Sequence, residues 1–242
     1  SRLVGSEMCI RDRYVGEKVG LGNGISLDIA VDPVEGTNFV ANNLPGGMSI
    51  LSVAKKGDLF NAPETYMEKI AFGSEIPNDC LDLDYSVKKN INNLADFKRV
   101  KTSELSVCIL DRPRHKKIID ELKRLKVNIK FITDGDVSGA LLVSDDKYGV
   151  DIFLGTGGGP EGVLVAAALD TFNCLFQGRF LFVTEEDKIR ANKMRITNLD
   201  KGNGFSGEVS RVEGTEVVSI ASTVVKIENL VFTYNNQNGQ VT

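Results

Sequence analysis

VCIL at residues 107–110, IKFI at 129–132 and VDIFL at 150–154 are short apolar segments that predict three buried strands. They alternate with segments of helical character at residues 113–125, 137–143 and 161–169. Strands and helices that alternate at this spacing are typical of a parallel sheet with helices on its faces. The stretch therefore predicts an α/β fold. Bound molecules on such a sheet gather beyond the carboxyl ends of its strands, which is where we look for a site.

The residues on either side of this stretch predict further strands and helices. Upstream, Ser86 suits the N-cap of a helix over residues 86–97. Downstream, Thr184-Glu-Glu-Asp187 is typical of a capping box and predicts a helix to about Met194. The other expected strands cover residues 25–31, 48–54, 66–72, 180–183, 216–221 and 230–234, with a hairpin turn at 55–58 and a return strand at 59–61. The chain shows no internal repeat and no linker, so we expect two interlocked lobes.

Charge and composition exclude several classes of protein. The net charge of −4 at pH 7 excludes a polycation that binds nucleic acid through bulk charge. No apolar run approaches the ~20 residues of a membrane helix, and the N-terminus lacks the apolar core of a signal peptide. We therefore expect no nucleic acid and no membrane among the partners. The four cysteines show neither disulfide nor zinc-site spacing, which indicates a reducing cytoplasm.

The first chemical motif is Asp32-Pro-Val-Glu35-Gly36-Thr37, at the end of a predicted strand. Asp32 and Glu35 can direct two carboxylates at one cation, and Gly36 allows the backbone to approach a phosphate. The chain has a single histidine, so a metal ion must be held mainly by carboxylates, which favours Mg²⁺ or Mn²⁺. An ordinary Asp/Gly turn that caps a helix is the alternative.

A polar or glycine-rich segment follows each of the three predicted strands at residues 107–110, 129–132 and 150–154. Arg112 and Arg114 suit a phosphate because their charge is permanent and forked. Asp134 and Asp136 suit sugar hydroxyls or a metal ion. The glycine run 155–162 predicts an anion-binding loop before a helix, where Glu161 can reach a cation. Each segment has an ordinary alternative, namely a helix cap, a solvated helix start or a loose match to a nucleotide loop.

Together these segments resemble class II fructose-1,6-bisphosphatase. The resemblance covers residue 14 to about residue 194, and it is carried in this order by DPVEGT at 32–37, NAPETYMEK at 61–69, RPRH at 112–115, DGD at 134–136 and GGGPEG at 157–162. It implies a layered sugar-phosphatase fold, with one mixed-sheet lobe and one parallel-sheet lobe, related to the Mg²⁺-dependent, lithium-sensitive phosphatases. It implies removal of the 1-phosphate of fructose 1,6-bisphosphate in gluconeogenesis by a homo-oligomer, and some members also hydrolyse sedoheptulose 1,7-bisphosphate.

The resemblance also implies roles for individual residues. The ligands of Mn²⁺ or Mg²⁺ would be Asp32, Glu35 and Glu161. The catalytic residues would be Asp32, Glu35 and Thr37, with Thr37 orienting the attacking water. The substrate would be bound by Glu35, Gly36, Thr37, Tyr66, Arg112, Pro113, Arg114, Asp134, Gly135, Asp136 and Gly158. For Tyr66 the residues alone give no independent reason, and an aromatic side chain in the core is the alternative.

The resemblance suggests how the chain is divided. Residues 1–13 show no structural period and are expected to be non-native. Residues 14–103 would form a metal- and phosphate-binding lobe, and residues 104–242 a sugar-binding α/β lobe. The family has further carboxylate-bearing residues before residue 14 and continues beyond residue 242. We therefore expect a chain truncated at both ends, with weak activity or none.

Three other functions stay open at this point. The first is a related phosphatase acting on inositol phosphate or another sugar phosphate. The second is a non-enzymatic nucleotide-binding module built on the glycine run. The third is a structural fragment with no function of its own, for which exposed apolar surface would be the sign.

Overall fold

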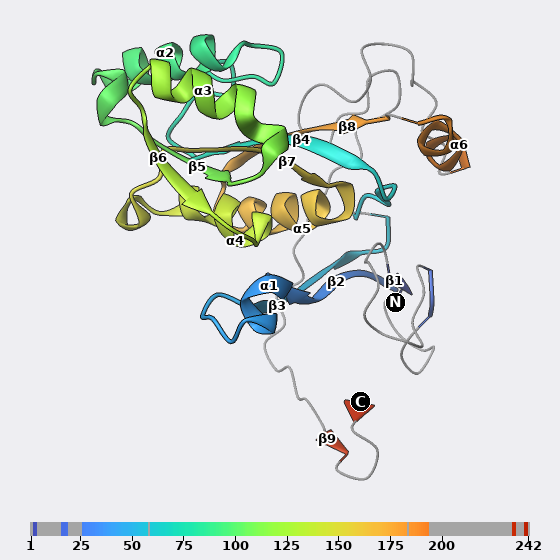
Figure 1. The fold of residues 1–242 in the computed structure, drawn as a ribbon. Coiled ribbons are helices and arrows are strands. Elements are labelled where there is room, and N and C mark those ends of the chain that lie inside the picture. The colour runs from blue at the N-terminus through green and yellow to red at the C-terminus, as the bar shows by residue number, and fades with distance from the viewer. Residues whose placement is uncertain are drawn as a thin grey trace.

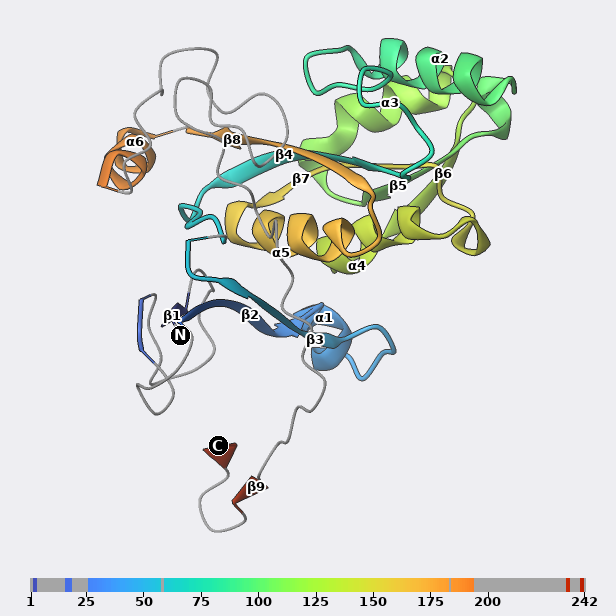
Figure 2. The same cartoon turned by 180° about the vertical axis from the view of Figure 1, so that it is seen from behind.

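The computed structural model describes residues 2–3, 16–18, 26–57, 59–182, 184–193, 234–235 and 240–241. Two sheets and two layers of helices are stacked on one another (Figures 1 and 2). The larger sheet has five strands in the order β6-β5-β7-β4-β8, and the smaller has three in the order β1-β2-β3. The predicted α/β fold class is confirmed. The strands expected in the tail, residues 216–221 and most of 230–234, lie outside the described residues.

The larger sheet is mixed because one of its strands, β4, comes from an earlier part of the chain and runs antiparallel to its neighbours. Strands β5 (Ser106–Leu110), β6 (Asn128–Ile132) and β7 (Ile152–Gly158) are parallel. Strand β4 (Tyr66–Phe72) pairs antiparallel with β7 on one side and with β8 (Leu175–Leu181) on the other. Strand β4 precedes the division between residues 103 and 104 that the sequence suggests, yet both strands with which it pairs follow that division. The division stays a prediction.

Helices cover both faces of the larger sheet (Figure 1). On one face, α2 (Val87–Lys98) and α3 (Lys116–Arg124) bury a cluster around Ile70, Ile91 and Leu122. The predicted N-cap of α2 is confirmed, since Lys89 N–H donates to Ser86 Oγ at 3.1 Å. On the other face lie α4 (Asp136–Ala140) and α5 (Gly159–Asp170). Short 3₁₀ turns connect these elements at Thr102–Glu104, Pro113–His115, Leu141–Ser144 and Asp146–Tyr148.

Helix α5 lies between the two sheets, which explains its composition. Its residues Gly162 to Ala167 are all buried, so the helix is apolar on every side rather than along one stripe. One cluster of apolar side chains joins α5 to both sheets, with Ala30 and Ala54 from the smaller sheet. A fully buried aliphatic side chain contributes about 2 kcal/mol to stability. The longest apolar run of the sequence therefore holds the two sheets together.

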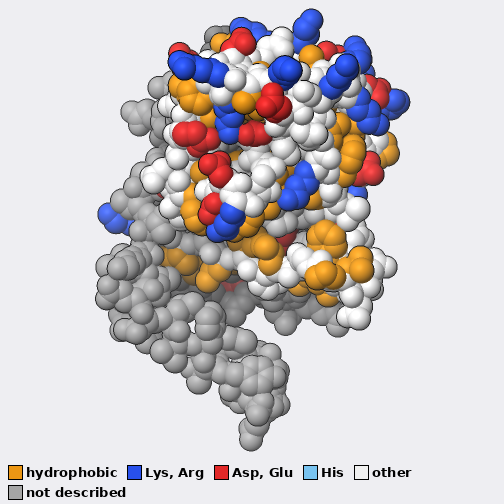
Figure 3. Space-filling view, turned by 90° about the vertical axis from the view of Figure 1, so that its left-hand side faces the viewer, with side chains coloured by type: hydrophobic (Ala, Val, Ile, Leu, Met, Phe, Trp, Pro, Cys, Tyr) orange, Lys and Arg blue, Asp and Glu red, His pale blue; other side chains and the backbone are white. Residues whose placement is uncertain are grey.

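The smaller sheet is less well covered than the larger one. Strand β2 (Leu27–Glu35) pairs antiparallel with β3 (Met48–Lys55), and β1 (Arg2–Leu3) adds to β2 in parallel. The helix α1 (Thr37–Ala41) follows β2. Three apolar side chains in this region are at least half exposed, namely Val40, Leu44 and Leu51. Figure 3 shows the same contrast, with charged side chains crowding the α2–α3 end and hydrophobic ones gathered towards the other.

Four predicted boundaries are wrong. The strand expected at 180–183 is instead β8 at Leu175–Leu181, because each of these residues is opposite a residue of β4. Residues 59–61 form no strand, because Leu59 and Phe60 are instead buried in the core shared with α5. Strand β2 does not stop at Asp32-Pro33 but runs to Glu35, since a register shift between Asp32 and Glu35 accommodates the proline. Strand β7 does not stop at Leu154 but continues to Gly158, because each of Gly155 to Gly158 is opposite a residue of β4.

The helix predicted after Thr184 is confirmed. Helix α6 (Glu185–Lys193) begins with the predicted capping box: Asp187 N–H donates to Thr184 Oγ1 at 3.1 Å, and Thr184 N–H to Asp187 Oδ2 at 2.9 Å. A short hairpin pairs β9 (Tyr234–Asn235) with β10 (Gln240–Val241). Within the described residues, no helix is long and apolar enough to cross a membrane.

Candidate active site

A cavity of about 400 Å³ lies where the carboxyl ends of the parallel strands face the smaller sheet. Its walls come from the end of β2, the segments after β5 and β6, and the junction of β7 with α5. All the predicted site residues line it except Tyr66 and Pro113. Those that do are Asp32, Glu35, Gly36, Thr37, Arg112, Arg114, Asp134, Gly135, Asp136, Gly158 and Glu161. Topology thus brings together residues from four separate segments of the chain.

The turn after β2 forms one wall. Val34 N–H donates to Asp32 Oδ1 at 3.0 Å, which fixes the Asp32 carboxylate across the bulge. Gly36 has φ of 74°, in the left-handed region that favours glycine, and it caps α1. A Cβ atom at Gly36 would lie 2.7 Å from Phe39 Cδ2, too close for a normal contact. Glycine at this position is therefore required both by the turn and by its neighbour.

Hydrogen bonds tie this turn to the segment after β6. Val137 N–H donates to Glu35 Oε1 at 2.8 Å, and Asn38 N–H donates to Asp134 Oδ2 at 2.9 Å. Arg112 Nη2 lies 3.4 Å from Asp134 Oδ1. The contacts of Glu35 and Asn38 join residues about a hundred positions apart. The cavity therefore depends on the docking of the smaller sheet against the larger one.

The electrostatics of the cavity centre on Glu35, which is buried. Burial raises the pKa of Glu35 to about 8, and the negative charges of Asp136 and Asp32 act in the same direction. The hydrogen bond from Val137 N–H opposes this rise. The negative charges of Asp32 and Asp136 thus act on Glu35 without enough positive charge beside it to keep it ionised at neutral pH. A bound cation would relieve this repulsion.

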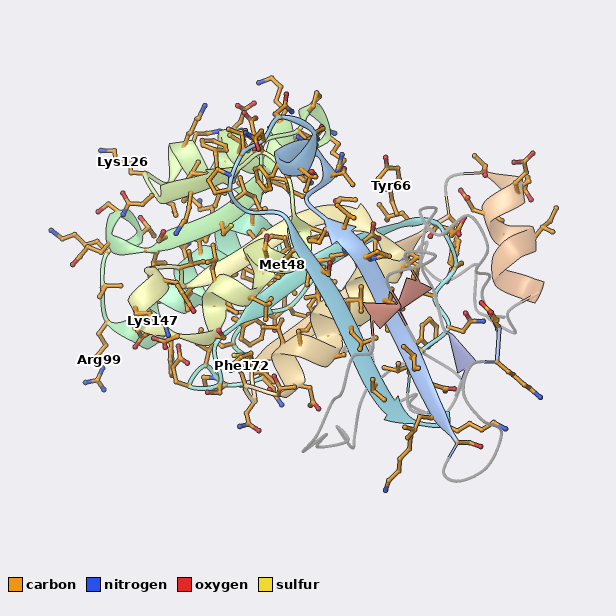
Figure 4. All side chains as sticks on the ribbon, turned by 90° about the horizontal axis from the view of Figure 1, so that it is seen from below. Met48, Tyr66, Arg99, Lys126, Lys147 and Phe172 are labelled. Atoms are coloured by element: carbon orange, nitrogen blue, oxygen red, sulfur yellow. The ribbon has the colours of Figure 1, made fainter. Side chains whose placement is uncertain are left out.

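The two arginines enter from the segment after β5. Arg114 Nε donates to the Thr156 carbonyl at 2.7 Å, and its guanidinium lies 5.3 Å from the centre of the Tyr66 ring. Tyr66 is 51% exposed and projects from the end of β4, as Figure 4 shows, so the alternative of a core aromatic is wrong. Pro113 does not line the cavity; it begins the 3₁₀ turn that carries Arg114.

His115 is fully buried behind the arginines. Thr156 N–H donates to His115 Nε2 at 2.8 Å, so the neutral ring carries its proton on Nδ1, which donates to the Leu110 carbonyl at 2.7 Å. Burial lowers the pKa of His115, although both backbone hydrogen bonds oppose this. The ring holds the end of β5 against β7 and so positions Arg114.

The glycine run does not form the predicted anion-binding loop. Gly155 to Gly158 belong to β7, paired with Lys69 to Tyr66 of β4. The glycines leave room for side chains: a Cβ at Gly158 would overlap the Glu161 carboxylate, and one at Gly157 would overlap Asp136. Gly157 and Gly158 therefore form a part of β7 without side chains, against which Asp136 and Glu161 pack.

Carboxylates are present for a divalent cation, but they do not form a complete cage. Among the described residues, no three histidine, cysteine, aspartate or glutamate side chains lie close enough together to hold a metal ion. Asp32 and Glu35 interact directly, and Glu161 lines the same cavity. Mg²⁺ is commonly held by one or two carboxylates, with water and substrate phosphate completing its shell. The donor set of Asp32 and Glu35 fits such an ion in type.

Sequence reasoning missed Lys69. Its side chain is buried in the larger sheet and forms an ion pair with Asp136 of the cavity. The signal was available: alternation along β4 places Lys69 on the same face as Met67 and Ala71, both fully buried. A charged residue at an interior position of a strand is rarely buried without a partner.

Comparison with known proteins adds independent information. A family model described as "Bacterial fructose-1,6-bisphosphatase, glpX-encoded" matches residues 6–238. Relatives from Prochlorococcus marinus strains MIT 9303 and MIT 9301 are each 38% identical over 201 residues, and one from strain NATL1A is 37% identical. All three are named D-fructose 1,6-bisphosphatase class 2/sedoheptulose 1,7-bisphosphatase.

The aligned part is 78% of this chain and 60% of each of these relatives, so the chain spans less than two thirds of their length. The family match nevertheless covers every segment that lines the cavity. The chain belongs to the family of bacterial, glpX-encoded fructose-1,6-bisphosphatases.

Proposed function

We propose that the cavity binds a sugar bisphosphate and that the protein to which this chain belongs hydrolyses its 1-phosphate. One observation carries the proposal: acidic residues, two arginines and the Asp134-Gly135-Asp136 turn line a single cavity. Hydrolysis of a phosphomonoester requires a site that binds an anion, stabilises its charge and positions water. Each requirement is matched by a residue type that lines the cavity.

A divalent cation, Mg²⁺ or Mn²⁺, would be held by Asp32 and Glu35, with Glu161 in reach of the same cavity. When bound, such an ion neutralises phosphate oxygens and lowers the pKa of a coordinated water. The raised pKa of Glu35 supports this assignment, because a cation beside it would favour the ionised form.

The other residues would bind and orient the substrate. Arg112 and Arg114 would hold a phosphate through forked, permanently charged groups, and Gly36 would let the backbone approach it. Asp134 and Asp136 would accept hydrogen bonds from sugar hydroxyls. The Thr37 hydroxyl would orient the attacking water. Tyr66, stacked beside Arg114, would limit how far that guanidinium moves.

The names of the relatives favour two substrates, fructose 1,6-bisphosphate and sedoheptulose 1,7-bisphosphate. Both present a phosphate next to a ketose carbon and differ in chain length. The nucleotide-binding alternative has lost its support, because the glycine run on which it depended is a strand. Within the described residues the cysteines are free thiols, in keeping with the reducing cytoplasm that we propose as location. A homo-oligomer stays a prediction.

The test measures binding and phosphate release separately. Calorimetry measures the binding of each bisphosphate to the purified chain under three conditions, namely in Mg²⁺, in Mn²⁺ and in EDTA. The release of inorganic phosphate is assayed in parallel. We expect binding that strengthens at least tenfold with a divalent ion, and its loss in Arg112→Ala. The control is Arg124→Ala, an exposed arginine of α3 that does not line the cavity. Binding of neither bisphosphate under any condition would contradict the proposal.

A further inference from the structure

The starting observation is a buried ion pair beneath the cavity. Lys69 lies on β4 with only 1% of its surface exposed, and its Nζ is paired with Asp136 Oδ2. Asp136 is 8% exposed and lines the cavity. Removing an ammonium group from water is costly, and a pair such as this one seldom stabilises a fold more than apolar residues of the same size would. Its place beside the site points to a role other than stability.

The surrounding backbone leaves space for the pair. A Cβ atom at Gly157 would overlap Asp136 Oδ2 and lie 3.2 Å from Lys69 Nζ. A Cβ atom at Gly162 would overlap Met67 Sδ and lie 3.4 Å from Lys69 Cε. Two glycines, one on β7 and one on α5, therefore adjoin the path of the lysine side chain. This packing leaves little free space beside the Lys69 side chain.

Asp136 connects the lysine to the rest of the site. The neighbouring Val137 N–H donates to Glu35 Oε1 at 2.8 Å, so the Asp136 segment is joined directly to the turn after β2. The negative charges of Asp136 and Glu35 repel each other. Lys69 supplies the opposing positive charge from the side of the larger sheet. It also holds Oδ2, which leaves Oδ1 outside this ion pair.

We propose that Lys69 is a positioning residue: it fixes the Asp136 carboxylate on the cavity wall, where that carboxylate accepts hydrogen bonds from the hydroxyl groups of a phosphorylated sugar. This inference rests on the proposed function of the site. Lys69 acts through Asp136 and does not itself contact the substrate. Its effect is therefore specific to the sugar part of the ligand and absent for inorganic phosphate.

The chain offers a matched control pair. Lys98 of α2 contacts Asp151 Oδ1 at 2.5 Å, and Asp151 Oδ2 accepts Ser106 N–H at 2.7 Å. This pair also joins a helix to the larger sheet, but neither residue lines the cavity. Lys98→Met therefore removes a partly buried lysine without changing the site.

The experiment compares Lys69→Met, Asp136→Asn, the double variant and Lys98→Met with the unaltered chain. Calorimetry with Mg²⁺ gives the dissociation constants of fructose 1,6-bisphosphate and of inorganic phosphate, and thermal melting shows that each protein is folded. For Lys69→Met we expect at least tenfold weaker binding of the sugar bisphosphate and less than a twofold change for phosphate. Lys98→Met lowers the melting temperature and leaves both dissociation constants unchanged.

The double variant provides a test that does not depend on the folding of Lys69→Met, because it contains neither buried charge. If Lys69 acts through Asp136, the double variant binds the sugar bisphosphate no more weakly than Asp136→Asn, which itself binds at least tenfold more weakly than the unaltered chain. A further tenfold loss in the double variant would overturn the inference, as would unchanged binding in a folded Lys69→Met. If the unaltered chain binds no sugar bisphosphate at all, the proposed function fails first and this inference with it.

Discussion

The two walls of the cavity use glycine for different reasons. In the turn wall, residues 32–37, Gly36 has φ of 74°, a backbone conformation that other residues adopt only with strain. In the strand wall, where Gly157 and Gly158 line the cavity and Lys69 lies buried behind them, the glycines are extended and pair with β4. There glycine is needed because a Cβ atom would meet Asp136 or Glu161. The turn wall needs glycine for its left-handed backbone conformation, and the strand wall needs glycine because a larger residue would displace the neighbouring carboxylates.

The walls also differ in how charge is compensated. Lys69 of the strand wall faces Asp136 in an ion pair. The turn wall holds Asp32 and Glu35 side by side, and the pKa of Glu35 is raised to about 8. The charge of Asp136 is therefore compensated from within the protein, whereas the turn wall is where we propose that a cation binds. Each prediction below tests one side of this contrast.

The largest effect is expected for Gly157→Ala in the strand wall. The added Cβ would overlap Asp136 Oδ2, which cannot move away without breaking its pair with Lys69. Overpacking of this kind costs about 3 kcal/mol of unfolding free energy. We also expect at least a hundredfold weaker binding of fructose 1,6-bisphosphate, because Asp136 is displaced. Urea denaturation and calorimetry measure the two effects.

Gly158→Ala is the matched control for stability. Its Cβ would meet only the carboxylate end of the flexible Glu161 side chain, which can rotate. We expect a loss below about 1 kcal/mol. Equal destabilisation by the two alanines would show that space around the buried pair is not what selects glycine in the strand wall.

The second effect concerns pH and the turn wall. A carboxyl whose pKa is raised on folding binds its proton more tightly in the folded state, so Glu35 costs no stability below its unfolded pKa near 4.5. The cost grows as the pH rises and is complete above about 8. In EDTA we therefore expect Glu35→Gln to be more stable than the unaltered chain at pH 9, on the order of 2 kcal/mol, with little difference at pH 5.

Divalent ions test whether ionisation of Glu35 causes this loss of stability. Adding Mg²⁺ at pH 9 should stabilise the unaltered chain and remove the advantage of Glu35→Gln, since the ion neutralises the carboxylate. Denaturation curves at the two pH values, with and without Mg²⁺, measure the change. A constant difference between the two proteins from pH 5 to pH 9 would mean that Glu35 does not titrate in this range.

Much of this arrangement follows from local sequence. Apolar segments ending at Leu110 and Ile132 predicted the strands, and the rule that ligands gather at strand ends placed Arg112 and Asp134 correctly in one cavity. The motif from Asp32 to Thr37 was found because its residue types suit a cation and a phosphate. These successes share one property: the information lies within a few residues of the site.

The failures depend on residues far apart in the chain. Glycines usually signal a turn, but Gly155 to Gly158 become a strand because β4, more than eighty residues earlier, supplies hydrogen-bond partners. Lys69 was overlooked for the same reason, since its partner Asp136 lies on another element. Pairing of distant segments decided both cases, and a single sequence does not show which segments pair.

The smallest effect is expected for Gly36→Ala in the turn wall. The left-handed conformation costs an alanine about 1–2 kcal/mol, and contact with Phe39 adds to this unless the ring rotates. The control is Gly149→Ala, where φ is 62° and a Cβ would meet nothing within 4 Å, so that only the backbone cost applies. We expect Gly36→Ala to lose slightly more unfolding free energy than Gly149→Ala. Gly36→Asn should recover part of the loss, because asparagine tolerates this conformation better than alanine does. If asparagine gives no recovery, conformation is not the reason for glycine in the turn, and the contrast between the two walls fails on this side.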